Sequence, residues 1–284
     1  MKKTFEELYQ QVNEKLITFG GQAYPKSGHV VILAGGAGSG KGFIKDNLLG
    51  IEGFSFDVDH LKSLSLRAPK LIQMIKDEFG QDITKFKLKN PSDVSTLHDI
   101  IGGQLKLQNK KLTALYTSIL TTPQVDKPNI IFDVTLKDLN KLDKISRGVQ
   151  QLGYDKKKIH IVWVLNDVEV AKKQNQDRDR TVDVDILINT HQGVSQTMSQ
   201  IIDMGDRIKK FMDGAIIIAF NKIFVDSELV KSPRGGSYLK SADYVVLKEP
   251  GKSPVKHSDM SDKLLKKIAS YAPPIKGWEW EKGK

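Results

Sequence analysis

The sequence predicts an α/β protein in which a parallel β-sheet is flanked by helices. Short apolar runs rich in β-branched residues alternate with segments of helical spacing, as in sheets whose strands are joined by crossover helices. A glycine-rich stretch, residues 35–41, directly follows the first apolar run, residues 29–34. A buried strand that leads at once into glycines and one lysine is typical of a phosphate-binding loop at the start of a helix.

Composition limits the classes of protein that the chain can belong to. Its 284 residues, 39% hydrophobic and 27% charged, suit one large soluble domain, or a domain with appendages. The sequence has no apolar run near the roughly 20 residues of a membrane-spanning helix and starts without a signal-like apolar region, so we expect no membrane association. Zero cysteines exclude disulfides and thiolate catalysis, and they are compatible with the cytoplasmic location that we expect.

The formal net charge of +10 favours anionic partners, such as nucleotides or nucleic acid. A lysine-rich surface can also serve solubility alone, and both interpretations stay open.

Apolar spacing up to residue 120 predicts elements in a clear order. They are a helix over 4–19, a strand over 29–34, a helix over 43–49, a strand over 54–57, and a mainly helical stretch over 61–120. Within that stretch, apolar residues from Leu71 to Phe79 mark one helix, and those from Leu97 to Leu112 mark a second one beyond Pro91.

The second half of the chain continues the alternation. It predicts a strand over 129–134, a helix over 139–152, a strand over 159–165, a helix capped by Asn166 or Asp167, a long helix over 186–211 and a strand over 215–220. After these we expect a loop over 232–236, a short strand over 244–247 and a helix over 261–271.

Residues 35–41 fit the pattern G-x-x-x-x-G-K of a nucleotide-binding P-loop. Glycines let backbone N–H groups converge on phosphate oxygens, Lys41 adds a charge for the β- and γ-phosphates, and the helix that starts near Gly40 points its positive end at the same anion. The residues predicted to contact the nucleotide are Gly36, Ala37, Gly38, Ser39, Gly40, Lys41, Gly42 and Phe43.

Two positions depart from the usual loop. Gly42 stands where a Ser or Thr hydroxyl normally holds Mg²⁺, and Phe43 stands where adenylate-kinase-like loops carry Thr. Metal coordination would then depend on phosphates, water and a carboxylate elsewhere.

Polar residues follow two further predicted strands, at the edge where ligands bind in open α/β sheets. A carboxylate after residue 56, Asp57 or Asp59, can accept the proton of an attacking hydroxyl, and Lys62 can hold an anionic group of the acceptor. An N-cap aspartate with a solvated lysine is the alternative. Asp133 and Thr135 end the next strand, where Asp133 can hold Mg²⁺ or its waters, or be an ordinary strand-end residue.

Two arginines, Arg178 and Arg180, lie in a loop between predicted helices. They can close over a triphosphate and neutralise the charge on the phosphoryl group in transfer, or form local salt bridges with neighbouring aspartates. His191 and Gln192 in the following helix form a weaker candidate cluster, although a lone histidine in a helix also fits an ordinary surface or core residue.

The ordered set of motifs resembles the zeta-toxin-like and polynucleotide-kinase-like P-loop kinases, which are related to adenylate kinase. The resemblance covers about residues 30–220 and rests on the P-loop, Asp57-x-Asp59-x-Leu-Lys62, Asp133-x-Thr135 and Asn175-x-x-Arg178-x-Arg180-x-Val182. It implies that Asp59 is the general base, Lys62 an acceptor-binding cation and Arg178 and Arg180 the lid arginines, with Asp57 and Thr135 at the substrate. The family has many phage members, and a phage origin is consistent with the resemblance.

The predicted division of the chain departs from this family at one point, a long insertion where such kinases bind the acceptor. Residues 1–247 would form the kinase domain, with a helical acceptor-binding insertion at about 62–127 and a lid at about 175–183, followed by a basic extension over 248–284. Trp278 and Trp280 in that extension can stack on bases or dock the tail on its own domain.

The expected function is therefore that of a kinase that uses ATP or GTP with Mg²⁺ to phosphorylate a hydroxyl of a nucleic acid, nucleotide or related anionic acceptor. Two alternatives stay open: a sugar-nucleotide kinase of the toxin type, and a nucleotide-gated binding protein with little turnover.

Overall fold

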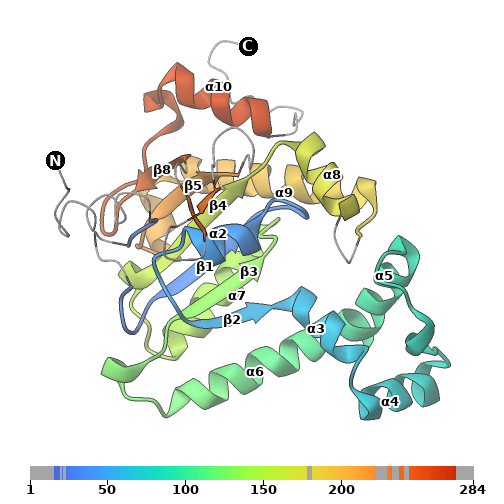
Figure 1. The fold of residues 1–284 in the computed structure, drawn as a ribbon. Coiled ribbons are helices and arrows are strands. Elements are labelled where there is room, and N and C mark those ends of the chain that lie inside the picture. Colours follow the sequence, from blue (N-terminus) through green and yellow to red (C-terminus); the bar gives the residue numbers. More distant parts are fainter. Residues whose placement is uncertain are drawn as a thin grey trace.

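A computed structural model describes residues 16–19, 21, 24–177, 181–221, 229–231, 237–239 and 243–272. Its centre is a six-stranded sheet in the order β2-β3-β1-β4-β5-β8 (Figure 1). The strands are β1 (Val30–Ala34), β2 (Phe54–Asp57), β3 (Ile130–Val134), β4 (Ile159–Leu165), β5 (Ile216–Phe220) and β8 (Asp243–Lys248). The α/β fold predicted from the sequence is confirmed.

The first five strands are parallel, but β8 runs antiparallel to β5 at the edge of the sheet. The predicted parallel sheet therefore has one antiparallel strand at its edge. A parallel neighbour needs a long crossover connection, usually a helix. Between β5 and β8 the described residues include an antiparallel pair of short strands, β6 (Leu229–Lys231) and β7 (Ser237–Leu239), which sequence analysis missed.

Helices cover both faces of the sheet because successive side chains of a strand point to opposite faces. Val30 and Ile32 of β1 lie in the core shared with α7 (Leu139–Gln151), α9 (Val184–Asp203) and α10 (Asp262–Tyr271). Val31 and Leu33 lie in the core on the other face, against α2 (Lys41–Asn47). Both faces of the central strands are therefore buried, as their continuous apolar sequence predicts.

The predicted helical stretch lies beyond the β2 edge of the sheet (Figure 1). It contains α3 (Val58–Ser65), α4 (Pro69–Phe79), the short 3₁₀ turn η1 (Ile83–Lys85), α5 (Pro91–His98), the π-helical turn η2 (Asp99–Gln104) and α6 (Leu107–Leu120). The end of this stretch that carries α4 and α5 has a small core of its own, formed by Ile75, Ile83, Leu97, Ile100, Ile101 and Leu105.

The second helix predicted in this stretch, beyond Pro91, is divided into α5, η2 and α6. The division falls at two adjacent glycines, Gly102 and Gly103, and at Lys106, whose φ of 50° lies in the left-handed region. An L-residue with that backbone conformation interrupts an α-helix, so apolar spacing alone could not show the break.

Other predicted boundaries need smaller corrections. The helix predicted over 186–211 is α9, which ends at Asp203, followed by the 3₁₀ helix η5 (Gly205–Lys210), and the two meet at Gly205 with a φ of 53°. The helix predicted over 4–19 is wrong at its end, because Ile17 pairs with Leu49 in an isolated parallel bridge. Residues 4–15 lie outside the described residues, as do the loop over 232–236 and both Trp278 and Trp280.

Helix α10 is where the sequence predicts it, and Ser261 caps it by accepting a hydrogen bond from the Leu264 amide. Leu265, Ile268 and Tyr271 are buried in the core on the α9 face of the sheet. The domain boundary at residue 247 stays a prediction, but the described part of the C-terminal segment packs on the same core as the sheet. None of the described helices is long and apolar enough to cross a membrane.

Candidate active site

The P-loop connects β1 to α2 as the sequence predicts. Gly40, the residue before α2, has a φ of 88°, a conformation that favours glycine because a Cβ atom would strain it. The Lys41 side chain folds back over the loop, where its ammonium donates hydrogen bonds to Gly35 O (2.9 Å) and Gly36 O (3.2 Å). Lys41 is thereby held above the loop, where it can meet a bound phosphate.

Several amides of the P-loop are available to an anion. In the described part of the chain, no protein acceptor binds the N–H groups of Gly38, Gly40, Lys41 and Gly42. The Ala37 amide donates to Thr190 Oγ1 (3.2 Å), and the Ser39 amide to Gly36 O (3.2 Å). Uncapped N–H groups in a glycine-rich turn form the kind of concavity that binds phosphate.

Two predicted nucleotide contacts point elsewhere. Ser39 is fully buried, and Phe43 packs against the core beneath α2. Contact of Ser39 and Phe43 with the nucleotide therefore stays a prediction.

Asp57 and Asp59 have different structural roles. Asp57 ends β2 and caps α3, since its Oδ1 accepts the Asp59 amide at 2.7 Å. The Asp59 carboxylate is about half exposed and lies 3.4 Å from the ammonium of Lys62, which is buried. Asp57 thus fulfils the capping alternative, while Asp59 faces the cavity with Lys62 beside it.

Asp133 ends β3 next to Lys41. Its Oδ1 lies 3.6 Å from Lys41 Nζ. Burial raises the pKa of the Asp133 carboxyl, and the negative charges of Asp57 and Asp59 raise it further, whereas the Lys41 ammonium opposes the shift. The charges of Lys41, Asp57 and Asp59 therefore all act on the Asp133 carboxyl.

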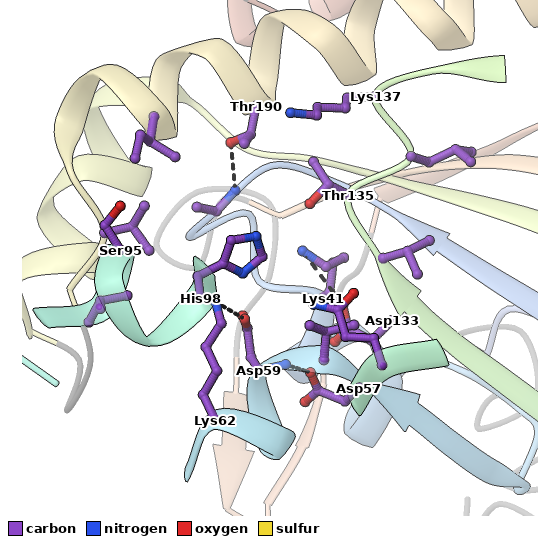
Figure 2. A pocket seen from close by; sticks show the side chains of 18 of the residues that line it. Lys41, Asp57, Asp59, Lys62, Ser95, His98, Asp133, Thr135, Lys137 and Thr190 are labelled. Atoms are coloured by element: carbon purple, nitrogen blue, oxygen red, sulfur yellow. Dashed lines mark hydrogen bonds and ion pairs between the residues drawn. The ribbon is translucent and has the colours of Figure 1, made fainter. Parts of the chain in front are cut away.

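These side chains line one cavity of about 410 Å³, which Figure 2 shows from close by. Thr135, Lys137 and Lys141 line it from the β3–α7 connection and α7, and Thr190 lines it from α9. The insertion forms another wall, with Pro91, Val94, Ser95, His98 and Gln108. The volume lies within the range of ligand pockets, about 300–1,000 Å³.

The described residues of the predicted lid bond to each other and to the predicted insertion. Asn175, at the end of α8 (Val168–Asp177), donates to Val182 O (2.7 Å) and accepts from the Val182 amide (3.0 Å). Thr181 binds the insertion, through its amide to Leu88 O (2.9 Å) and its hydroxyl to Lys89 O (2.6 Å). Arg178 and Arg180 lie outside the described residues, so their role stays a prediction.

Sequence analysis did not predict the contacts that four residues make with the P-loop. Thr190 and His191 reach it from α9, Asn166 from the end of β4 and Asn221 from the end of β5. The two asparagines directly follow buried strands, which is the signal that led to Asp133. Asn166 was considered only as a helix cap, but Asp167 caps α8 by accepting from the Glu169 amide at 2.8 Å.

The residues at this edge fit a Mg²⁺ ion that arrives with a nucleotide. No group of three potential metal ligands is arranged in the described residues to hold an ion without help. Mg²⁺ usually keeps several waters and binds one or two carboxylates together with substrate phosphates. Asp133, whose charge burial disfavours and which has other carboxylates nearby, is a site that such a cation would stabilise.

Comparison of the sequence with protein-family models and with curated proteins found no match. Among solved structures, the chain is similar to the PezAT chromosomal toxin–antitoxin system of Streptococcus pneumoniae, at 16% identity over 76% of this chain and 77% of that chain, with a TM-score of 0.37. It is also similar to the AvrRxo1-ORF1:AvrRxo1-ORF2 complex with sulphate ions (13% identity, 95% and 72% of the chains, TM-score 0.43) and with ATP (12%, 96% and 73%, 0.40). These similarities concern the course of the chain and assign no role to any residue.

Proposed function

We propose that this protein is a P-loop kinase that transfers the γ-phosphoryl group of ATP or GTP to a hydroxyl of an acceptor bound in the cavity beside Lys41. The observation that carries the proposal is that Lys41, Asp59 and Asp133, three residues predicted from separate motifs, line a single cavity. Lys41 and Asp59 follow β1 and β2, and Asp133 is the last residue but one of β3; these three strands are adjacent in the sheet and parallel. The carboxyl edge of such strands is where open α/β sheets bind ligands.

The P-loop would bind the phosphates of the nucleotide. The amides of Gly38, Gly40, Lys41 and Gly42, which have no protein acceptor among the described residues, can donate to phosphate oxygens, and Lys41 can exchange its bonds to Gly35 O and Gly36 O for bonds to the β- and γ-phosphates. The exchange replaces two neutral acceptors by charged ones, which favours the bound state.

Asp59 is the proposed general base. A base must reach the hydroxyl whose proton it accepts, and the Asp59 carboxylate faces the cavity. Asp57 instead has a structural role, because its capping bond fixes the start of α3. Lys62 would hold an anionic group of the acceptor next to the hydroxyl, with Asp57 and Thr135 also at the acceptor.

Asp133 is the proposed Mg²⁺ residue, acting through water. When bound, the ion would neutralise charge on the β- and γ-phosphate oxygens. Arg178 and Arg180 are proposed to add positive charge from the lid. Support for this role comes from their neighbours Val182 and Asp183, which line the cavity.

The acceptor is proposed to be a nucleotide, a sugar nucleotide or the end of a nucleic acid strand. Three lysines, Lys62, Lys137 and Lys141, line the cavity and suit an anionic group. The volume of about 410 Å³ suits one nucleotide-sized unit and not a duplex segment.

The test is incubation of the full chain with γ-labelled ATP or GTP, Mg²⁺ and a panel of candidate acceptors. The panel contains 5′-hydroxyl oligonucleotides, nucleosides, nucleotides, sugar nucleotides and proteins, and Lys41→Ala protein is the control. Label transferred by the wild-type protein and not by the control supports a kinase. Tight nucleotide binding with no transfer to any member of the panel would favour the nucleotide-gated binding protein instead.

A further inference from the structure

The carbonyl groups of the P-loop are as informative as its amides. In a loop that binds phosphate, each peptide unit that turns its N–H toward the anion turns its C=O away from it, and a buried C=O needs a hydrogen-bond donor. The first two carbonyls, Gly35 O and Gly36 O, accept from Lys41, and the last, Gly40 O, accepts from the Ile44 amide inside the first turn of α2. These donors belong to the P-loop motif itself.

The three middle carbonyls have donors from outside the motif. Ala37 O lies 2.8 Å from His191 Nε2 on α9. Gly38 O accepts from Asn166 Nδ2 (3.1 Å), directly after β4, and Ser39 O accepts from Asn221 Nδ2 (2.8 Å), directly after β5. Every carbonyl from Gly35 to Gly40 therefore has a donor, and three separate elements supply the donors of the central turn.

The chemistry of each donor is defined by its partner. A carbonyl oxygen only accepts, so His191 must carry its proton on Nε2. Burial lowers the pKa of His191, and the Lys41 charge lowers it further, so the ring is neutral at pH 7 and donates without bringing a second cation to the loop. The amide groups of Asn166 and Asn221 must likewise direct Nδ2, not Oδ1, at the loop.

The glycines of the loop make room for these donors. A Cβ atom on Gly36 would lie 2.3 Å from the His191 ring, and one on Gly40 would lie 1.6 Å from Asn221 Nδ2. Neither distance is possible for real atoms. Gly36 and Gly40 are thus needed on the side of the loop away from the phosphate as well as on the side that faces it.

Among the described residues, the two asparagines use only the donor side of their amides. Both are fully buried, and within the described residues Asn166 Oδ1 and Asn221 Oδ1 have no hydrogen-bond partner. A buried amide oxygen without a partner destabilises a fold, so the acceptor side of neither amide contributes to stability. What both side chains supply is a donor for a buried loop carbonyl, and Asn166 Nδ2 also donates to Gln174 Oε1 (3.1 Å).

We propose that His191, Asn166 and Asn221 are positioning residues that hold the central P-loop carbonyls away from the nucleotide, so that the amides of the same turn face its phosphates. The inference rests on the proposed nucleotide site and goes beyond it by naming residues outside the motif on which the site depends. Without these donors the central peptide units can rotate, and carbonyl oxygens then approach phosphate oxygens of the same sign. The expected result is a loss of nucleotide affinity in a protein that is still folded.

The experiment compares ATP binding by calorimetry, in the presence of Mg²⁺, between the wild-type full chain and variants of each donor. Asn166→Asp and Asn221→Asp keep the side-chain shape and replace the donor by an oxygen. His191→Met removes the donor, whereas His191→Gln keeps an N–H donor near the same place. Asn129→Asp is the matched control. Asn129 is also a buried asparagine and donates to two carbonyls, Pro25 O and Glu52 O. It directly precedes β3, at the amino-terminal ends of the strands and away from the P-loop.

We expect Asn166→Asp, Asn221→Asp and His191→Met to weaken ATP binding by about tenfold or more, the effect of losing one well-placed hydrogen bond and leaving its partner unpaired. His191→Gln should stay near the wild-type affinity, and Asn129→Asp should lower the melting temperature while it binds ATP normally. Should an aspartate variant fail to fold, the two His191 variants decide the question. Folded donor variants with wild-type affinity would overturn the positioning role alone, whereas a wild-type chain that does not bind ATP would overturn the proposed function and the positioning role together.

Discussion

Asp57 Oδ1 accepts the backbone amide of Asp59 at 2.7 Å, so the first of these two aspartates caps the helix on which the second one stands. This bond gives different roles to two carboxylates that look equivalent in the sequence. Asp57 fixes the start of α3, and Asp59, one residue into the helix, points its carboxylate at the cavity beside Lys62.

Asp59→Asn should therefore lower kcat by about 100-fold or more, because the amide keeps the shape of the carboxylate but cannot accept a proton. The affinity for the nucleotide should hardly change. Asp57→Asn should keep most of the activity, since asparagine is also a good N-cap, while Asp57→Ala should cost about 1 kcal/mol of stability. Steady-state kinetics and urea unfolding of the three variants measure this, and an inactive Asp57→Asn beside an active Asp59→Asn would reverse the assignment.

Lys41→Ala should weaken the binding of ATP and abolish transfer without unfolding the protein. Its ammonium bonds only to loop carbonyls and to Asp133 among the described residues, and it is partly exposed, so removing it leaves the core intact. Lys209→Ala is the matched control, because Lys209 pairs with Asp206 in η5, outside the cavity. Calorimetry with ATP and a melting curve are the measurements. A folded Lys41→Ala protein that binds ATP as tightly as the control would contradict the nucleotide site.

The hydrogen bond of Thr181 leads us to a prediction about the KM for the acceptor. The Thr181 hydroxyl donates to Lys89 O (2.6 Å) and links the predicted lid to the predicted insertion. Thr181→Val removes that donor and keeps the volume, so the KM for the acceptor should rise while the dissociation constant of ATP stays the same. Thr113→Val, on the exposed side of α6, controls for the substitution itself. Equal KM values in both variants would show that the link has no part in closing the cavity.

Two histidines at the amino-terminal ends of the strands, His29 and His160, lead us to a prediction of how the free energy of unfolding depends on pH. His29 Nδ1 lies 3.0 Å from His160 Nε2, and His160 Nδ1 accepts the Ala215 amide. His160 must therefore donate to His29, and both rings must be neutral. Burial, with a contribution from Lys158, lowers the pKa of His29 from 6.5 to about 4, and burial also lowers the pKa of His160.

The direction of this pH dependence follows from proton uptake by His29. Between pH 6.5 and 4 the unfolded chain binds a proton at His29 that the folded chain does not. The contribution of His29 to the free energy of unfolding therefore falls as the pH is lowered through this window, and it is constant above it. A shift of this size corresponds to a contribution on the order of 3 kcal/mol. His29→Gln removes the titrating group and keeps an acceptor for His160. Urea unfolding at several pH values should give a flatter profile for this variant, and parallel profiles would show that His29 is not the cause.

The sequence was sufficient where one local rule determines the structure. Strand β4 has the predicted bounds because its mainly apolar run lies between Lys158 and Asn166, and β2 has them because it starts after Gly53 and ends at Asp57, the cap of α3. Lys41 could be found from the P-loop pattern, and Asp59 and Asp133 because each is a polar residue near the end of a predicted strand. His191 could not, because its role depends on α9 passing over the P-loop, which brings Ala37 and His191 together over a separation of 154 residues.

The antiparallel direction of β8 and the helix break at Lys106 could not be predicted from the sequence for a similar reason. The direction of β8 depends on how the preceding connection folds, and the break at Lys106 depends on a backbone conformation that lysine rarely adopts. Neither leaves a mark in the spacing of apolar residues.

The last prediction concerns the acceptor. Lys85, Lys87 and Lys89 alternate along the insertion next to the lid contact, and the net charge of the chain is +10. If the acceptor is the end of a nucleic acid strand, we expect these lysines to contact phosphates of the strand outside the cavity. Each phosphate contact releases counterions, so the affinity for a labelled single strand should fall by about an order of magnitude or more between 50 and 200 mM salt.

Fluorescence anisotropy with a labelled single strand and a duplex, with and without a non-hydrolysable ATP analogue, measures this dependence. Replacing the three lysines by alanine should make the affinity less dependent on salt, because fewer phosphate contacts remain, whereas Lys209→Ala should not. A cavity of about 410 Å³ admits a strand end and not a duplex, so the single strand should bind more tightly. Absence of binding to either probe at low salt would mean that the basic surface serves solubility, and that the acceptor is a small molecule held by Lys62, Lys137 and Lys141.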